Sequence, residues 1–467
     1  MTRDPKSDAG DKARESTPAA VTPGDVTPEH QGRAGVFHAG GLGVSKESAV
    51  MLGVLPLGDP RREQQDPLSE LERLAETAGL EVRGRVVQKV TRPVAATYAG
   101  SGTVERVAQL AGDTGADTIL CDNDLSPAQL RNLEKLCKRK VVDRTDLILD
   151  IFARHARTNQ AMLQVELAQL EYARPRLRKM WGHLEGEQGG VGFRGPGEKQ
   201  LEMDKRMLGK RIRDLKRQLD QIRERKERQV STRSDIHTVA LVGYTNAGKS
   251  TLFGRLTESE PYIADRLFAT LDTRTRPFQV RTRVKAVLSD TVGFIDHLPH
   301  RLVESFHATL EEVLQADLLV HVVDAAGEDP LRHVESVNEV LEKIGCTDRP
   351  TITALNKVDA ADRSLLPFLR KRLPNPVGIS ARTGEGLEDL RDKIAMMLTE
   401  DEIRVELLVP YREGRFIAAV DAIASELEKE PGGERLKLVA RVSREGLGKL
   451  KRLIEDRDGV EVRRLDG

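Results

Sequence analysis

A glycine-rich turn with a single lysine follows a short apolar segment in the middle of the chain. Residues 243–250 read Gly-Tyr-Thr-Asn-Ala-Gly-Lys-Ser, directly after a predicted strand over 238–242. The glycines let main-chain N–H groups surround phosphate oxygens, the lysine adds a positive charge, and the serine hydroxyl can bind Mg²⁺. An ordinary strand-to-helix turn is the alternative, but the spacing favours a nucleotide phosphate site. Its predicted contacts are Gly243, Tyr244, Thr245, Asn246, Ala247, Gly248, Lys249 and Ser250, with Lys249 also acting in catalysis.

Two further segments could surround the terminal phosphate and its metal ion. Asp290, Thr291, Val292 and Gly293 end a predicted strand, where a carboxylate can hold Mg²⁺ through water and a glycine N–H can meet the γ-phosphate. Between this strand and the phosphate loop lie Phe268, Ala269, Thr270, Leu271 and Asp272, which we also expect to contact the nucleotide. Thr270 is predicted to join Ser250 as a protein ligand of Mg²⁺. A neighbouring threonine is the alternative, because this segment is repetitive.

The choice of base is predicted from two later segments. Asn356, Lys357, Val358 and Asp359 follow an apolar strand, and a carboxylate at Asp359 can accept both hydrogen-bond donors of guanine, which adenine lacks. Asn356 and Lys357 would brace this pocket, and Ser380, Ala381 and Arg382 would complete it through main-chain contact with the guanine oxygen. The alternative is that the Asn-Lys-Val-Asp segment caps a helix. The order and spacing favour GTP.

These segments need a parallel sheet to bring them to one edge. Apolar strands are predicted over 238–242, 284–288, 318–323, 351–355 and 377–379, with helical segments between them. We therefore predict a doubly wound α/β domain over 236–400, with the phosphate, metal and base segments at the strand ends.

The flanking regions predict four more parts. Residues 1–48 are rich in Pro, Ser, Thr, Asp and Gly and are predicted to be disordered, while 49–143 alternate between apolar runs and helical segments (68–78 and 104–111) and predict a small α/β domain. Residues 401–467 predict a small α+β domain with strands over 404–408, 436–442 and 460–464 and helices over 416–428 and 446–455. The fourth part covers residues 144–235.

Residues 144–235 predict a long antiparallel helical hairpin with a Gly-rich tip. Apolar side chains at four-three spacing define one helix that runs past a kink at Pro175 and a second helix that returns. The seam is formed by Leu163, Leu167, Leu170, Leu177, Trp181, Leu208, Ile212, Leu215, Leu219 and Ile222. The tip over 186–197 contains too many glycines to continue a helix. Trp181 and Phe193 could stack on bases or pack the end of the hairpin.

The hairpin concentrates positive charge. Residues 154–233 hold 20 lysines and arginines against 11 acidic residues, a net charge of +9 in a chain whose 74 basic and 74 acidic residues cancel. A neutral chain with one strongly basic part is suited to local contact with RNA phosphates, and a solvated spacer is the alternative. The predicted RNA contacts are Arg194, Lys199, Lys205 and Arg206.

Composition excludes several other classes of protein. Hydrophobic residues make up 39% of the 467, which is enough for buried cores and excludes disorder throughout. Three cysteines without metal-ligand spacing argue against a disulfide scaffold or a zinc module and favour a reducing compartment. No apolar run is long enough for a membrane span, so we expect a soluble, cytoplasmic protein. We also expect a monomer.

With these segments in order, the chain resembles the translation-factor class of P-loop GTPases and, more narrowly, the HflX family. The family-specific pieces are the hairpin turn Gly-Gly-Val-Gly-Phe-Arg-Gly-Pro-Gly-Glu-Lys-Gln-Leu-Glu (189–202) and Leu-Phe-Ala-Thr-Leu-Asp (267–272), accompanied by Asp-Thr-Val-Gly-Phe-Ile (290–295). The chain departs from the family in its N-terminal extension and in Thr273-Arg274, where Pro-Thr is often found.

The resemblance implies a GTPase that forms GDP and phosphate, with Mg²⁺ as its cofactor. It also implies binding to the RNA and proteins of the large ribosomal subunit, and splitting or rescue of stalled ribosomes under heat or antibiotic stress. A GTP-regulated RNA-remodelling or ribosome-assembly factor is the alternative. An RNA-remodelling motor with a second ATP site is disfavoured, because residues 49–142 contain no second phosphate loop.

Two residues at the reacting phosphate depart from the Ras-type pattern. Phe294 stands where Ras-type GTPases carry the glutamine that orients water, so intrinsic turnover should be slow and stimulated by the ribosome; alternatively, Phe294 only packs against the sheet. Asn246 resembles the asparagine that, in a subset of GTPases, helps to hold K⁺ beside the phosphates. The alternative for Asn246 is a hydrogen bond within the loop.

Overall fold

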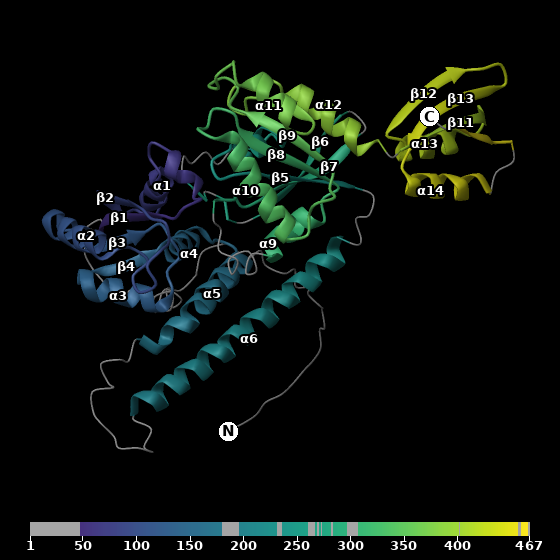
Figure 1. Ribbon diagram of the computed structural model, residues 1–467. Coiled ribbons are helices and arrows are strands. Elements are labelled where there is room, and N and C mark those ends of the chain that lie inside the picture. The colour runs from purple at the N-terminus through teal and green to yellow at the C-terminus, as the bar shows by residue number, and fades with distance from the viewer. Residues whose placement is uncertain are drawn as a thin grey trace, which may run out of the picture. The chain divides into compact units, whose positions relative to one another are not determined.

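The computed structural model describes residues 47–179, 196–230, 236–259, 267–268, 270–271, 273–281, 284–296, 307–400, 402–455 and 459–465 (Figure 1). Residues 1–46, most of the glycine-rich tip with Trp181, Phe193 and Arg194, and the predicted contacts Ala269 and Asp272 lie outside the described residues. The side chains of Leu177 and Lys199 also lie outside them. In the part of the chain that the structure describes, no helix is long and apolar enough to cross a bilayer.

The first α/β domain contains a four-stranded parallel sheet of order β2-β1-β3-β4. Its strands are β1 (Ser48–Leu55), β2 (Glu81–Lys89), β3 (Thr118–Cys121) and β4 (Lys140–Asp143), and its helices are α1 (Ser69–Thr77), α2 (Ser101–Thr114), α3 (Pro127–Cys137) and α4 (Arg144–His155). A 3-10 turn, η2, covers Pro60–Glu63. Because β1 begins at the buried Ser48, the predicted extension ends before that residue.

Alternating side chains of the strands divide this domain into two apolar layers. In β1, Ala49 and Met51 pack with α1 and α4. Val50, Leu52 and Val54, which point to the other face of the sheet, pack with α2 and α3. The first layer is continuous with buried side chains of the central domain. Helix α4, which begins the predicted hairpin region at 144, lies in that first layer.

The hairpin region contains α5 (Asn159–Ala173) and α6 (Pro196–Val230), which lie side by side (Figure 1). Leu163, Leu167, Ile212, Leu215 and Leu219 form their buried seam, with Leu170, Leu208 and Ile222 packed around it. The predicted continuation of the first helix through Pro175 is wrong, because a 3-10 segment, η3, follows α5 over Arg174–Lys179. Glu166 and Glu171 of α5 form ion pairs with Arg211 and Lys216 of α6 at 2.6 and 2.8 Å.

The central domain contains a six-stranded sheet of order β10-β9-β8-β5-β7-β6, which is parallel except for the edge strand β6. The strands are β5 (His237–Val242), β6 (Arg274–Gln279), β7 (Lys285–Asp290), β8 (Leu318–Asp324), β9 (Thr351–Asn356) and β10 (Pro376–Gly378). The helices are α7 (Lys249–Leu256), α9 (His307–Leu314), α10 (Pro330–Lys343), α11 (Leu366–Arg372) and α12 (Leu387–Leu398). The five predicted parallel strands are confirmed, and β6 is additional.

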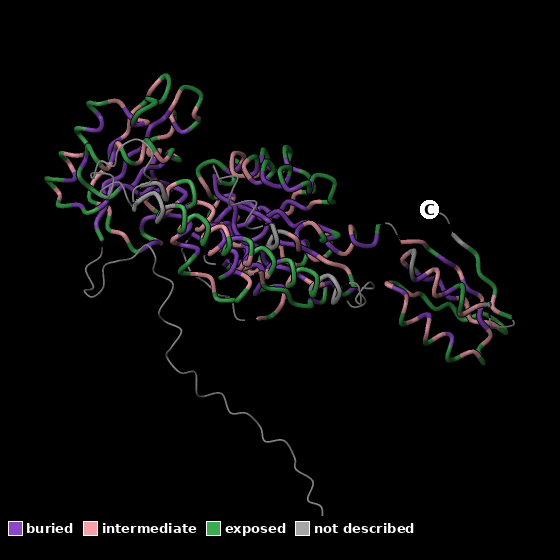
Figure 2. The backbone as a smooth tube through the Cα atoms, turned by 90° about the horizontal axis from the view of Figure 1, so that it is seen from below, coloured by how far each residue is buried: buried purple, intermediate pink, exposed green. Residues whose placement is uncertain are grey.

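Helices cover both faces of this sheet, which is the doubly wound arrangement. The strand residues Val239 and Leu241 pack with α7 and α12, whereas their neighbours Ala240 and Val242 pack with α9 and α10. Helix α11 joins α10 in a cluster with Val323 and Leu355. In Figure 2 the buried residues accordingly follow the strands, and exposed residues lie on the outer sides of the helices.

The C-terminal region forms an antiparallel sheet of order β12-β13-β11-β14. Its strands are β11 (Ile403–Pro410), β12 (Glu426–Pro431), β13 (Arg435–Val442) and β14 (Glu461–Leu465), and α13 (Gly414–Ile423) and α14 (Arg444–Glu455) complete its apolar core. The predicted helix over 416–428 is wrong at its end, because residues 426–431 form β12. This segment has alternating charges and pairs with β13, so tertiary pairing overrides its helix propensity.

Candidate active site

The glycine-rich turn joins β5 to α7 in a conformation that its two glycines require. Gly243 has a φ of 150°, and a Cβ there would collide with the carbonyl oxygen of Val322. Gly248 has a φ of 97°, and a Cβ there would collide with the side-chain amide of Asn356. Asn246 also has a positive φ, 59°, which asparagine tolerates better than most residues. The turn is therefore fixed at both ends and wraps the start of α7.

Lys249 lies at the first position of α7 and folds back over the turn. Its ammonium donates to the carbonyl oxygens of Gly243 at 2.9 Å and Tyr244 at 2.8 Å, and the residue is 6% exposed. Burial lowers the pKa of Lys249 to about 8, although the carboxylate of Asp290 acts in the opposite direction. A phosphate here would exchange two neutral acceptors for charged oxygens, which favours the protonated amine.

The predicted metal ligands lie together at the C-terminal end of β7 and the N-terminal end of α7. The hydroxyl oxygens of Ser250 and Thr270 are 2.7 Å apart. Asp290 is fully buried, and burial raises its pKa, although the nearby hydroxyls of Ser250 and Thr270 act in the opposite direction. A buried carboxylate beside two hydroxyls is a donor set of hard oxygen atoms, which fits Mg²⁺.

The segments predicted to recognise the base form a braced pair of loops. The Asn356 side chain donates to the Ala247 carbonyl at 2.8 Å and accepts from the Ala381 N–H at 2.9 Å, so it links the phosphate loop to the 380–382 loop. Lys357, whose φ is 64°, forms an ion pair with Asp324 at 2.6 Å. Asp324 ends β8 and is not among the residues predicted from the sequence, although its position after an apolar strand is the usual signal.

Asp359 projects its carboxylate toward the same loop. A hydrogen bond from Ser380 is the main cause that lowers the pKa of Asp359, and Arg382 forms an ion pair with this carboxylate. Arg255 of α7 donates to the carbonyl oxygens of Ala381 at 3.2 Å and Arg382 at 2.6 Å, and the Val358 N–H donates to the Ile379 carbonyl at 3.2 Å. Asp359 is therefore ionised and held at the rim of a preformed loop.

The segment that follows β7 lies against the phosphate loop. The Phe294 N–H donates to the Gly243 carbonyl at 3.1 Å, and the Phe294 carbonyl accepts from the Thr245 N–H at 2.7 Å. A Cβ at Gly293 would lie 3.1 Å from the Lys249 ammonium. The Phe294 side chain is 2% exposed and packs in the apolar core with Phe268, Leu271 and Val292. These four side chains therefore serve packing, which leaves main-chain atoms for nucleotide contact.

Two hydroxyls near the phosphate loop have different environments. Thr291 donates to the Leu241 carbonyl at 2.6 Å and thus ties the end of β7 to β5. The Thr245 hydroxyl is buried without a hydrogen-bond partner beside Gly293. A buried unpaired hydroxyl is costly, so a polar ligand atom at this point would be favourable.

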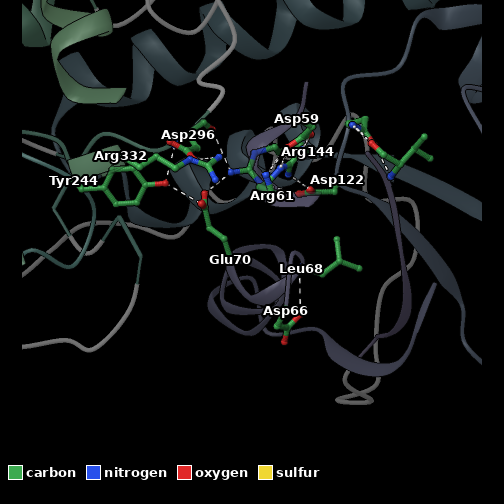
Figure 3. Close-up of polar contacts among 12 residues, drawn as sticks. Asp59, Arg61, Asp66, Leu68, Glu70, Asp122, Arg144, Tyr244, Asp296 and Arg332 are labelled. Carbon is green, nitrogen blue, oxygen red and sulfur yellow. Dashed lines mark hydrogen bonds and ion pairs between the residues drawn. The ribbon is translucent and has the colours of Figure 1, made fainter. Parts of the chain in front are cut away.

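Tyr244 connects the phosphate loop to the first domain (Figure 3). Its hydroxyl donates to Glu70 of α1 at 2.8 Å and accepts from the Asp296 N–H at 2.8 Å. Its ring stacks on His333 of α10 with centroids 4.0 Å apart. Burial raises the pKa of Tyr244, so the hydroxyl keeps its proton and its donor role. One side chain therefore touches the phosphate loop, the 290–296 segment and the first domain.

A buried ion-pair cluster supports this junction. Arg144 donates to the Asp296 carbonyl at 3.2 Å and pairs with Asp122 at 2.7 Å and with Glu70, while Arg61 also pairs with Asp122 (Figure 3). The Asp296 carboxylate in turn pairs with Arg332 at 2.6 Å. Removing one member would leave an uncompensated buried charge. The predicted site did not include this cluster, and its only sequence signal was charged residues beside buried strands.

The first domain also packs on the segment that carries Thr270. The ring of Phe152 in α4 meets that of Phe268 edge-on, with centroids 4.7 Å apart. Phe268 and Phe294 thus share one apolar core with α1 and α4. Both segments that are predicted to border the terminal phosphate consequently contact the first domain.

The predicted RNA contacts that can be described lie on α6. Lys205 and Arg206 are exposed, and Arg206 has only a distant ion pair, 3.9 Å, with Glu202. Lys210 and Arg213 are exposed on the same helix. The helix therefore offers several solvated cations.

Comparison with known proteins decides the family. Three family models match the chain. The model described as "GTP-binding GTPase N-terminal" matches residues 65–153, that described as "GTP-binding GTPase Middle Region" matches 155–233, and that described as "50S ribosome-binding GTPase" matches 238–357. The protein named "GTPase HflX" from Magnetococcus marinus is 43% identical over 89% of this chain and 97% of its own. The protein of the same name from Escherichia coli is 43% identical over 84% of this chain and 93% of its own. The chain belongs to the HflX family.

A solved structure is also similar. The GTP-binding protein from Sulfolobus solfataricus in complex with GDP is 26% identical, covers 76% of this chain and 99% of its own, and has a TM-score of 0.40. As an HflX GTPase, the chain binds guanine nucleotide and hydrolyses GTP, and the site above is where its motifs meet.

Nucleotide affinity of this HflX protein should fall as pH rises above about 8. In the free protein Lys249 loses its proton around that pH, whereas bound phosphates keep it protonated, so binding must take up a proton. We expect the affinity for a fluorescent GDP analogue to be about fivefold lower at pH 8.6 than at pH 7. Arginine stays charged at these pH values, so the affinity of Lys249→Arg should lose the pH dependence that comes from residue 249. Any pH dependence that comes from titration of the nucleotide base should remain. A Lys249 protein with the same pH profile as the arginine variant would show that Lys249 is not the titrating group.

The Tyr244 hydroxyl should hold the 290–296 segment closed. Tyr244→Phe keeps the stacking on His333 but removes the acceptor of the Asp296 N–H, so hydrogen–deuterium exchange in a 290–296 peptide should be about tenfold faster. Tyr411→Phe is the matched control, because Tyr411 donates to the Gly432 carbonyl in the C-terminal region and should leave this peptide unchanged. Equal exchange in wild type and Tyr244→Phe would contradict the role given to the hydroxyl.

Proposed function

We propose that this HflX GTPase binds the large ribosomal subunit in its GTP state and splits or rescues stalled ribosomes under heat or antibiotic stress. The observation that carries the proposal is the match of the central domain to a 50S ribosome-binding GTPase, in a chain whose α6 presents exposed cations. The proposed partners are ribosomal RNA and proteins of that subunit, and the proposed state is a cytoplasmic monomer.

The proposed roles at the nucleotide follow from the geometry above. Ser250 and Thr270 would hold Mg²⁺ directly, and Asp290 would do so through water. The ion would offset charge on the β- and γ-phosphates. Lys249 would turn from the loop carbonyls to the phosphate oxygens, and Gly293 would offer its N–H to the γ-phosphate. Asp359 would exchange Arg382 for the guanine donors.

The junction at Tyr244 suggests how nucleotide and ribosome binding are linked. The γ-phosphate must enter where Gly293 and Phe294 now contact the phosphate loop. Movement of that segment would reach the first domain through Asp296, Arg144 and Glu70. The 290–296 segment would then have two positions, one of which the γ-phosphate favours. Because the first domain contacts this segment, nucleotide binding and ribosome binding would each change the affinity for the other.

A potassium ion at Asn246 is part of the proposal. It would stand beside the phosphates and offset transition-state charge in place of an arginine. GTP hydrolysis should then be faster in K⁺ than in Na⁺ or Cs⁺, with and without ribosomes.

A ribosome-assembly or RNA-remodelling factor is the second candidate, because a basic helical region beside a GTPase would serve it equally. It would bind an incomplete large subunit in preference to the mature one. Competition between mature and precursor subunits separates the two functions.

Neutralising the predicted hairpin cations should weaken ribosome binding. The variant with Arg194, Lys199, Lys205 and Arg206 changed to Gln should bind large subunits more weakly and lower the salt slope of binding by about 3, while affinity for GDP stays unchanged. The control changes the exposed Arg412, Arg415, Lys451 and Arg452 to Gln, which removes the same charge from the C-terminal region. Equal binding of the two variants at every salt concentration would leave the hairpin as a spacer.

A further inference from the structure

Helix α11 of the central domain presents an unusual exposed face. We call this the α11 face and define it as Arg363, Leu365, Phe368, Lys371 and Arg372, all of which are exposed. Phe368 is 48% exposed and Leu365 is 45% exposed.

Packing of α11 does not account for the α11 face. Leu369 and Leu373 pack in the cluster with Val323, Val334 and Leu355, so the helix is already anchored without the α11 face. Cations in the last turn complement the partial negative charge of a helix C-terminus. That effect serves Lys371 and Arg372, but it explains neither the half-exposed Phe368 nor Arg363, which precedes the helix.

The charge of the α11 face is not neutralised locally. Among the described residues, no carboxylate lies within ion-pair distance of Arg363, Lys371 or Arg372. The one acidic residue between 360 and 375 is Asp362, whose side chain accepts from the Ser364 N–H at 2.8 Å. The α11 face therefore combines exposed apolar surface with three cations that have no ion-pair partner among the described residues.

Phe368 and Arg372 are arranged for stacking. The Arg372 guanidinium lies over the Phe368 ring, 5.0 Å from its centroid, and nearly half of Phe368 remains exposed despite it. Aromatic rings bordered by guanidinium groups are the platforms on which unpaired bases stack, while nearby cations bind the phosphates. Three cations beside an exposed ring match the phosphates and bases of a single-stranded RNA segment.

We propose that the α11 face docks on RNA that has an unpaired base, which stacks on Phe368 while Arg363, Lys371 and Arg372 contact its phosphates. This rests on the proposed function, because the RNA within reach of a ribosome-bound GTPase is ribosomal. It adds an RNA contact on the GTPase domain itself, separate from the hairpin.

The test uses the full chain with two probes, intact large subunits and deproteinised large-subunit RNA. Lys371→Gln/Arg372→Gln should weaken binding to both probes about tenfold at moderate salt and lower the salt slope by about 1.5 to 2. Phe368→Ala should weaken binding about tenfold without changing the slope, and Phe368→Tyr should restore it. Arg370 is left unchanged, because its guanidinium lies against Gly378, two residues before Ser380.

The matched control is Arg276→Gln/Lys285→Gln, two exposed cations of β6 and β7. It should bind within twofold of wild type, and every variant should keep its GDP affinity. If the α11 variants bind like this control, the inference is overturned. If they lose affinity for intact subunits but not for free RNA, the partner is a protein and the inference is also overturned. A wild-type chain that binds free RNA through the α11 face but does not bind subunits would contradict the proposed function alone.

Discussion

Asp359→Asn is expected to change a GTP-selective protein into one that prefers xanthosine triphosphate. The carboxylate is ionised, since the Ser380 hydrogen bond lowers its pKa, and it can accept both guanine donors. An asparagine amide instead donates to the added oxygen of xanthine, which a carboxylate repels. Sites that pair buried polar groups with a substrate discriminate strongly, so GTP affinity should fall by roughly 100-fold or more.

Competition binding of GTP and xanthosine triphosphate to both proteins measures this change. Asp362→Asn is the matched control, because Asp362 is exposed three residues later and its carboxylate accepts from the Ser364 N–H. It should leave base preference as in wild type. Unaltered GTP selectivity in Asp359→Asn would place the base-recognising carboxylate elsewhere.

Large subunits should stimulate GTP hydrolysis at least about tenfold, equivalent to ~1.4 kcal/mol of barrier lowering. Phe294 has no hydrogen-bonding side chain, is 2% exposed, and its main-chain N–H and carbonyl are both bonded to the phosphate loop. It therefore cannot orient the attacking water, and the free protein should turn over slowly. On the ribosome, a rearrangement of the 290–296 segment would allow the attacking water to be positioned.

Single-turnover kinetics with large subunits, small subunits and no ribosome decide this point. Small subunits are the control and should have no effect. The hairpin variant should lose stimulation in proportion to its loss of binding while keeping its free rate. A free protein that is already fast, and that large subunits do not accelerate, would refute ribosome-gated hydrolysis even though the chain remains a GTPase.

The sequence predicted the parts of the fold that depend on local patterns. The parallel strands of the central sheet are apolar runs bounded by turn residues, and they were predicted correctly. Strand β6, Arg274–Gln279, was missed because it is an edge strand with one buried residue, Phe278. Strand β12 was predicted to be helical because the partners of its charged residues lie on other elements, such as Lys437 and Arg441 of β13. Local propensity carries no information about such partners.

The candidate site divides in the same way. The phosphate loop and the base segment lie at strand ends, so a parallel sheet brings them together. The contact of Arg144 with Asp296 spans 152 residues, and that of Tyr244 with Glu70 spans 174. Neither residue type nor spacing predicts such contacts, because they depend on how one domain packs on another. The contacts of the phosphate loop and the 290–296 segment with the first domain could therefore be found only in the structure.

Co-sedimentation with separated ribosomal subunits tests the central claim most directly. The full chain is mixed with large or small subunits in a non-hydrolysable GTP analogue, in GDP, or without nucleotide. We predict that it pellets with large subunits at least about tenfold more tightly in the GTP analogue than in GDP, and that it does not pellet with small subunits. Equal recovery with both subunits, or recovery that is independent of the nucleotide, would contradict a GTP-switched factor of the large subunit.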